Sequence, residues 1–243
     1  MLSITGFKIV KEFIESSTQT VRDIYLQEGA AGDTGDKIAA LAGKKSIPVM
    51  FWPHDDMKKI FQGKIKNGIV ARLDKFAYSD IDVILDKRPD KSFFVILDRV
   101  YDPHNLGAIA RSAHCFGAAA VVIQERRAPS ITETSIHASA GALAHLPVVQ
   151  VVNLSRTVDY LKKKGFWVYG TSAGAGGGDV ALMDFSGDVV IIFGSEGEGI
   201  RKKLLERCDF EVSVPMGRGF DSLNVSVAAG IVLYTVNKKL FPQ

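Results

Sequence analysis

Apolar and polar residues alternate along this chain in blocks whose lengths match short strands and amphipathic helices. The clearest strand signals are the apolar runs at 93–98, 119–123 and 189–193. Segments with apolar residues at helical spacing lie between such runs. Strands that alternate with helices are typical of a parallel sheet that helices cover on both faces. The pattern therefore predicts an α/β fold.

The second part of the chain carries the stronger pattern. Ser130 and Glu133 have the spacing of a capping box, and Gly117 and Gly165 follow helical segments as terminating residues. The predicted order is strand 93–98, helix 106–115, strand 119–123, a helix to about 142, strand 147–151, helix 155–164, strand 166–169, strand 189–193, helix 200–207, strand 210–214 and helix 224–239.

The pattern in the first part of the chain predicts a smaller unit in which helices and strands alternate. It reads as a helix begun near Thr5-Gly6, strand 21–26, helix 36–43, strand 47–52, helix 54–61 and strand 68–73, with a turn at 33–35. A charged stretch with a short apolar segment at 81–85 follows it. We therefore predict an N-terminal domain at 1–74, a linker at 75–91 and a larger domain at 92–243.

Composition narrows the class of protein. The 243 residues are 47% hydrophobic and 23% charged, which indicates a globular chain rather than a disordered one. The net charge of +3 permits a nucleic-acid partner without arguing for one. The sequence shows no signal peptide and no apolar run long enough for a bilayer, so we expect a cytoplasmic protein without membrane contact. Cys115 lies in an apolar helical segment and is predicted to be a core residue.

Several common sites fit the sequence poorly. The run Gly174–Gly178 fails the dinucleotide-binding spacing because Asp179 takes the third glycine's place, so we expect a surface loop there. The histidines lack partners at the spacing of metal ligands, and we expect no metal site. Serines lack the surroundings of a hydrolase nucleophile.

Three polar turns instead follow predicted strands. Asn105 and Arg111 come after strand 93–98, Glu196 lies between glycines after strand 189–193, and 222–226 opens the last helix. Each has a simpler explanation: a helix cap, a solvated arginine or a charge at a helix start. Because the carboxyl ends of parallel strands share one edge, three such turns in one domain favour a single built site.

The residues of these turns resemble the three signature motifs of the SpoU-type RNA 2′-O-ribose methyltransferases, part of a knotted methyltransferase superfamily. They are Asp102-Pro-His-Asn-Leu-Gly107 with Arg111, then Phe193-Gly-Ser-Glu-Gly-Glu-Gly199, then Val214-Pro-Met216 with 222–228. The resemblance covers about 92 to the C-terminus. The segment before it is similar, at Thr5-Gly6 and 68–72, to a kink-turn-binding ribosomal protein.

The resemblance implies S-adenosylmethionine as methyl donor, a deep trefoil knot near the C-terminus, and a homodimer whose RNA site lies where two catalytic domains meet. Catalysis or substrate placement would fall to Asn105, Arg111, Glu196, Ser222 and Asn224. Cofactor contacts would fall to Gly170, Thr171, Gly194, Val214, Met216, Leu223 and Ser226.

These roles are chemically sensible. The planar fork of Arg111 suits a phosphate group and would place the neighbouring ribose. Arg111 is also a candidate base, as proposed for the family, although a guanidinium gives up its proton at high cost. Glu196 would orient Asn105 or Arg111. Arg126 and Arg127 are candidate phosphate contacts, and the charges of Arg218 and Asp221 would influence which nucleotide fits.

We therefore expect an enzyme that methylates a ribose 2′-hydroxyl of structured RNA, with a guanosine of large-subunit ribosomal RNA favoured. The nearest alternatives are a transfer-RNA methyltransferase and a ribosomal-RNA enzyme that confers antibiotic resistance. An RNA-binding protein that kept the fold and lost catalysis belongs to a different class. Phosphate contacts would make RNA affinity strongly dependent on salt.

Overall fold

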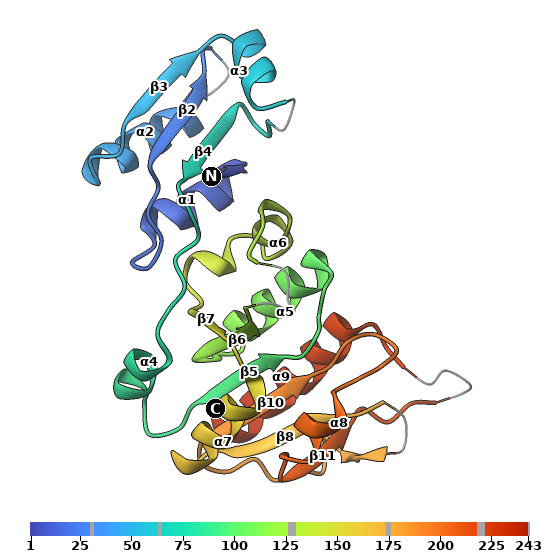
Figure 1. The fold of residues 1–243 in the computed structure, drawn as a ribbon. Coiled ribbons are helices and arrows are strands. Elements are labelled where there is room, and N and C mark those ends of the chain that lie inside the picture. The colour runs from blue at the N-terminus through green and yellow to red at the C-terminus, as the bar shows by residue number, and fades with distance from the viewer. Residues whose placement is uncertain (30–31, 63–64, 126–129, 174–175, 218–221, 243) are drawn as a thin grey trace. The chain divides into compact units, whose positions relative to one another are not determined.

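The computed structural model describes residues 1–29, 32–62, 65–125, 130–173, 176–217 and 222–242. It divides into two compact units (Figure 1). The first unit joins Met1–Ala77 to Ile131–His145, and the second joins Tyr78–Ser130 to Leu146–Gln243. Residues 131–145 lie inside the predicted 92–243 domain, but they pack with the first unit. The compact units therefore depart from the predicted boundaries at this segment.

The first unit is built on a four-stranded sheet in the order β1-β4-β2-β3. Strand β4 is antiparallel to β1 and β2, whereas β2 and β3 are parallel. The strands are β1 Leu2–Thr5, β2 Asp23–Gln27, β3 Val49–Trp52 and β4 Ile69–Leu73. The helices are α1 Phe7–Glu15, α2 Gly32–Lys44, α3 His54–Ile60 and α6 Glu133–Ala138, followed by a 3₁₀ turn at Ala142–Ala144.

Polar contacts explain why residues 131–145 belong to the first unit. The Glu133 carboxylate accepts a hydrogen bond from the backbone N–H of Ser3 at 2.7 Å. The Ser16 hydroxyl donates to the carbonyl of Ala144, and His145 contacts Glu12 at 2.8 Å. These contacts hold α6 and the following turn against β1 and α1.

The second unit is a seven-stranded parallel sheet in the order β7-β6-β5-β10-β8-β11-β9. The strands are β5 Phe93–Leu97, β6 Ala120–Gln124, β7 Val148–Val151, β8 Trp167–Thr171, β9 Gly178–Asp179, β10 Val189–Phe193 and β11 Phe210–Ser213. The predicted parallel α/β sheet is confirmed. Gly178 belongs to a short edge strand, while 174–175 of the predicted loop lie outside the described residues.

Helices cover both faces of this sheet. They are α4 Ile81–Lys87, α5 Pro103–Cys115, α7 Leu154–Lys163, α8 Lys202–Leu205 and α9 Val225–Leu240. Phe94 and Ile96 of β5 pack in one core with α4, α7 and α8. Because side chains alternate along a strand, Phe93 and Val95 point to the opposite face, where α5 packs against α9. None of the helices in the described ranges is both long and apolar enough to cross a membrane.

Three local predictions are corrected by the structure. Helix α5 begins at Pro103 because Asp102 caps it, accepting from the His104 N–H at 2.9 Å, so Asn105 is not a helix cap. The capping box before α6 is Thr132 with Ser135, rather than Ser130 with Glu133. The predicted turn at 33–35 lies within α2, where Asp33 pairs with Lys37 one helical turn away at 2.6 Å.

The predicted burial of Cys115 is wrong, because α5 turns this residue away from its buried face and exposes it. Cys208 is partly buried, and burial, with smaller effects of Glu211 and Asp209, raises the pKa of its thiol to about 12. The thiolate is the reactive form of cysteine. The two thiols should therefore differ in reactivity.

We predict that a disulfide reagent at pH 8 labels Cys115 of the folded protein and leaves Cys208 unmodified. At that pH Cys208 remains almost entirely in the thiol form, because burial raises its pKa to about 12. Peptide mapping after labelling reads out the site, and Cys115→Ser is the control that should label only after unfolding. Equal labelling rates of the two thiols would contradict the predicted difference.

Candidate active site

A cavity of about 430 Å³ opens at the carboxyl ends of β8, β10 and β11. Its volume is in the range of small-molecule sites. The described residues between β11 and α9 contribute Val214, Met216, Ser222, Leu223 and Asn224 to its wall. The described lining residues are Thr171, Ser172, Ala173, Phe193, Gly194, Ser195, Glu196, Gly197, Gly199, Val212, Ser213, Val214, Met216, Ser222, Leu223, Asn224, Val225, Ala228 and Val232.

The loop after β10 folds back on itself because of Gly194. A Cβ atom on Gly194 would lie 2.1 Å from the carbonyl carbon of Gly199 and 2.3 Å from the nitrogen of Ile200, so no other residue fits. Ser195 and Gly199 exchange two backbone hydrogen bonds, at 3.2 and 3.0 Å. Gly197, at the turn, has a φ of +85°, which L side chains rarely adopt. This reversal places Glu196 at the rim of the cavity.

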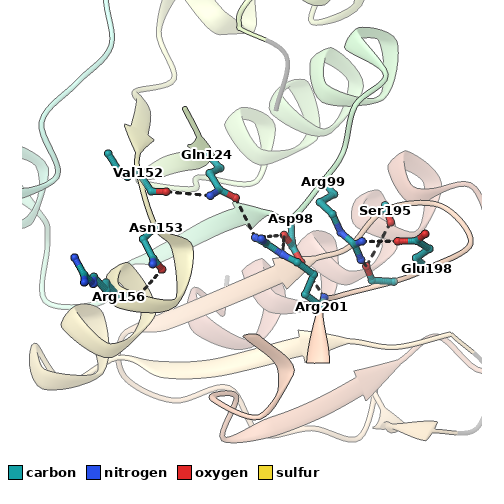
Figure 2. A network of polar contacts seen from close by, with 10 residues as sticks. Asp98, Arg99, Gln124, Val152, Asn153, Arg156, Ser195, Glu198 and Arg201 are labelled. Carbon is teal, nitrogen blue, oxygen red and sulfur yellow. Dashed lines mark hydrogen bonds and ion pairs between the residues drawn. The ribbon is translucent and has the colours of Figure 1, made fainter. Parts of the chain in front are cut away.

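Arg99 braces the same loop from the end of β5 (Figure 2). Its guanidinium donates to the Glu198 carboxylate and, at 3.4 Å, to the Gly199 carbonyl. Arg99 itself has a φ of +59°, and its buried Nε finds no hydrogen-bond partner among the described residues. Left-handed backbone costs energy for a non-glycine residue and persists where the surroundings hold it. The brace therefore fixes the loop at some cost in backbone strain.

Asn105, Glu196 and Asn224 form one hydrogen-bonded cluster beside the cavity. Oε1 of Glu196 accepts from Nδ2 of Asn224 at 2.6 Å and from Nδ2 of Asn105 at 3.1 Å. Nδ2 of Asn224 also donates to Oδ1 of Asn105 at 3.1 Å. The cluster joins three segments far apart in sequence: the first turn of α5, the loop after β10 and the N-cap of α9. Hydrogen bonds to a charged acceptor are the stronger kind, so this cluster orders all three.

The amide of Asn224 serves a second purpose. Its Oδ1 accepts from the backbone N–H of Ser226 at 2.9 Å and from the Ser226 hydroxyl at 2.6 Å, which caps α9. The Oδ1 atom of Asn224 thus caps α9, while its Nδ2 atom donates to Glu196. The capping role of Asn224 is confirmed, and its place in the site stays a prediction.

The cavity suits a ligand with an apolar ring and a positive charge. Glu196 is the one charged side chain among its described lining residues, and nine of the nineteen are aliphatic or aromatic. The Ser172 hydroxyl is buried at the wall and has no partner among the described residues. A nucleoside bearing a cationic group fits this combination.

Most predicted site residues converge on this cavity. The predicted residues among its lining are Thr171, Gly194, Glu196, Val214, Met216, Ser222, Leu223 and Asn224. Asn105 is buried next to them and reaches Glu196 and Asn224. Ser226 lies one step back and contacts Asn224.

Two predicted residues, Gly170 and Arg111, lie outside both the cavity and the Asn105–Glu196–Asn224 cluster. Gly170 faces the other side of the sheet, where a Cβ would lie 2.8 Å from Sγ of Cys208. Arg111 is exposed on α5, and no side-chain hydrogen bond or ion pair joins it to the described residues, including Glu196. Arg126, Arg127, Arg218 and Asp221 lie outside the described residues.

The prediction missed part of the wall. Ser172 and Ala173 directly follow the predicted Gly170-Thr171 contact, so the end of β8 was the available signal. Val232 comes from the second turn of α9, and its apolar spacing gave no reason to separate it from the core. The brace by Arg99 had no local signal.

Comparison with known proteins identifies the family. Residues 92–234 match the model of the SpoU rRNA Methylase family, and residues 3–79 match the model for RNA 2′-O ribose methyltransferase substrate binding. The chain belongs to the SpoU rRNA methylase family and is a methyltransferase that acts on RNA.

Two relatives match over nearly their whole length. The 23S rRNA (guanosine-2′-O-)-methyltransferase RlmB of Coxiella burnetii is 35% identical over 98% of this chain and 95% of its own. YacO of Bacillus subtilis, a TrmH family protein named for tRNA or rRNA methylation, is 35% identical over 98% of this chain and 96% of its own.

A solved structure shares the fold. The SpoU methyltransferase AviRb of Streptomyces viridochromogenes, crystallised with AdoMet, has a TM-score of 0.83 and 23% identity. It matches over 97% of this chain and 89% of its own.

We predict that Asn224→Ser and Asn224→Ala separate the two uses of this side chain. Serine retains an oxygen that can cap α9, whereas alanine removes it, so Asn224→Ala should cost about 1 kcal/mol more stability. Urea denaturation measures the difference, and hydrogen exchange in the first turn of α9 locates it. Both variants lose the Nδ2 donor to Glu196. Equal stability of the two variants would contradict the capping role.

Proposed function

We propose that this protein transfers a methyl group from S-adenosylmethionine to a ribose 2′-hydroxyl of structured RNA, with a guanosine of large-subunit ribosomal RNA as the target. The observation that carries the proposal is the Asn105–Glu196–Asn224 cluster beside the cavity. It joins the three motifs at one point, next to a space for a small molecule.

The cavity fits the proposed methyl donor. Its apolar wall suits an adenosine, and backbone groups of Gly194, Val214 and Leu223 supply polar contacts around it. The Glu196 carboxylate complements a positive charge. When bound, S-adenosylmethionine supplies an electrophilic methyl group carried on a sulfonium.

Glu196 is arranged to contact the substrate hydroxyl. Both amide donors of the cluster bind the same carboxylate oxygen, Oε1. Oε2 accepts no hydrogen bond from the described residues. We assign Oε2 as the acceptor that orients the 2′-hydroxyl, since a hydroxyl is a weak nucleophile until its proton is held or removed. Asn105 and Asn224 keep the carboxylate in this orientation.

Arg111 acts as a phosphate anchor in this proposal. Its guanidinium is exposed and is not paired with an acid in the described chain. A fork of five N–H donors binds a phosphate in two-point geometry and would fix the attached ribose. Because a guanidinium is protonated at neutral pH, positioning is the role its chemistry favours over that of a base.

The finer features of fold and substrate also belong to the proposal. The chain after β11 contributes Val214, Met216 and Leu223 to a cavity shared with the loops after β8 and β10. This placement supports a trefoil knot at the C-terminal end. Residues 1–74 would bind structured RNA, as their match to the substrate-binding model supports. The similarity to the guanosine-modifying relative RlmB supports a guanosine target. Because YacO is named for tRNA or rRNA methylation, transfer RNA is the second candidate substrate.

A methyl-transfer assay tests the proposal. We expect labelled methyl from S-adenosylmethionine to enter 23S rRNA isolated from cells that lack the activity, and the modified linkage to resist alkali. Arg111→Ala should lower transfer about 100-fold, because a misplaced ribose loses alignment with the methyl group. Donor affinity, measured by calorimetry, should not change since Arg111 lies outside the cavity.

The control is Lys163→Ala, which removes another exposed cation of the second unit. It should transfer methyl at the native rate. Incorporation into tRNA alone would favour the second candidate. Tight RNA binding without any transfer would overturn the enzymatic proposal.

We further propose that two copies assemble through the outer face of α9. Val227, Ile231 and Tyr234 are exposed there at spacings of four and three residues, which forms one stripe. Leu223 and Tyr101 are exposed apolar residues of the same unit. Exposed apolar surface that is contiguous marks interaction sites. Helix α9 also contributes Val225, Ala228 and Val232 to the lining of the cavity.

Replacing Val227 and Ile231 with aspartate should convert a dimer to a monomer, because charges would face each other without solvent. Light scattering coupled to size-exclusion chromatography measures the mass. Val83→Asp, at an exposed apolar position on α4, is the matched control and should leave the mass unchanged. A monomeric native protein with full methyl transfer would exclude this assembly.

A further inference from the structure

A second cavity, of about 570 Å³, lies at the carboxyl ends of β6 and β7. Its described lining residues are Gln124, Val152, Asn153, Leu154, Ser155, Arg201, Lys202, Lys203 and Leu204. They come from two strand ends, the first residues of α7 and the beginning of α8. Three of these side chains are cationic, and none of the described lining residues is acidic.

Asp98 and Gln124 hold Arg201 in place (Figure 2). Its Nε donates to Oδ1 of Asp98 at 2.8 Å, and its backbone N–H donates to Oδ2 at 2.9 Å. Nη2 donates to Gln124 at 3.0 Å, and Gln124 in turn donates to the Val152 carbonyl at 3.0 Å. Asp98 is fully buried, so it neutralises Arg201 from inside the fold. Nη1 makes no hydrogen bond to the described residues.

Two further cations lack partners. Lys202 and Lys203 are exposed, and no ion pair joins either to an acid in the described chain. Glu206 follows on α8 and Glu125 follows β6, but neither lines the cavity. The charge around the second cavity is therefore positive, because the Asp98 carboxylate is already paired with Arg201. Arg156, on the first turn of α7, is exposed and adds a positive charge close by.

Backbone groups favour the same sign of charge. Leu154 and Ser155 are the first residues of the ten-residue helix α7 and line the cavity. The first N–H groups of a helix have no partner within it, and the helix dipole places partial positive charge there. Asn153 satisfies only the N–H of Arg156. This helix start supplements the lysines and does not by itself define a site.

One chain segment links this cavity to the methyl-transfer cavity. The loop Gly194–Gly199 carries Glu196 to the first cavity, and Arg201–Lys203 directly after it line the second. Both cavities open at the carboxyl edge of the same sheet. The ends of β6 and β10 are two strand spacings apart, about 10 Å. An RNA strand whose target ribose lies at the rim of the first cavity could place the phosphate groups of neighbouring nucleotides in the second.

We propose that this second cavity binds backbone phosphate groups of the substrate RNA, a few nucleotides from the one that is methylated. Lys202 and Lys203 supply contacts that carry charge and no base identity, and Arg201 supplies a fixed N–H donor. The site rests on the proposed RNA methylation for its ligand. It adds an anchoring point outside the three motifs.

The test compares Lys202→Gln/Lys203→Gln with the matched control Lys87→Gln/Lys163→Gln. The control removes the same charge from exposed lysines of α4 and the C-terminal end of α7. RNA affinity is measured by fluorescence anisotropy across a salt series with a 23S rRNA fragment. Loss of two phosphate contacts should flatten the slope of log affinity against log salt by roughly 1.4–1.8. The control should keep the native slope.

Methyl-transfer kinetics give the second readout. The Lys202→Gln/Lys203→Gln protein should show a raised KM for RNA, by roughly tenfold, with kcat at saturating RNA and donor affinity unchanged. A slope and KM equal to those of the control would overturn the inference while leaving the methyl-transfer proposal intact. If the native protein transfers no methyl, the salt slope still tests the phosphate site by itself.

Inorganic phosphate distinguishes a polymer site from a site for a free anion. The RNA assignment predicts that millimolar phosphate shifts the melting temperature of the native protein and the Lys202→Gln/Lys203→Gln protein equally. A phosphate-dependent shift lost only in the lysine variant, together with an unchanged RNA salt slope, would assign the cavity to a small anion and overturn the proposal.

Discussion

The close approach of Gly194 to Gly199 and Ile200 is the constraint on which the polar edge of the second unit depends. Because Gly194 has no Cβ, the chain can reverse immediately after β10 and bring Gly199 and Ile200 against it. The reversal leaves Glu196 outside, returns Ile200 to the core and delivers Arg201 to Asp98. This one tight turn therefore sets the positions of both acidic Glu196 and basic Arg201.

Several polar side chains at this edge of the sheet are held in position by hydrogen bonds to partner groups. Glu196 is held by two amides and Arg201 by a buried carboxylate, while Arg99 ties the loop to the end of β5. Such fixed groups do not need to be ordered when a ligand binds, which lowers the entropic cost of binding. The hydrogen-bonded partners lie 28 to 103 residues apart in the sequence. Folding therefore brings them together and holds them in these orientations.

Sequence patterns predicted the sheet and the polar turns at its edge, because strand ends and glycine turns are local signals, whereas the apolar cavity residues Val214, Met216 and Leu223 came from the family resemblance. The parallel strands, Glu196 and Asn224 followed from them. The start of α5 was misplaced by three residues, although Asp102 before Pro103 carried the correct capping signal. The Asp98–Arg201 pair had no local signal, since 103 residues separate its members and only folding brings them together. Strand β1 was missed because four residues give too short an alternation.

The packing of residues 131–145 with the first unit means that the chain passes between the compact units three times. A fragment cut after Ala77 would contain four strands and three helices but would lack Glu133 against Ser3 and Ala144 against Ser16. Excision at a single boundary would therefore leave unpaired backbone groups and uncovered surface on both pieces. Any attempt to exchange the N-terminal unit among relatives has to carry the distant α6 segment with it.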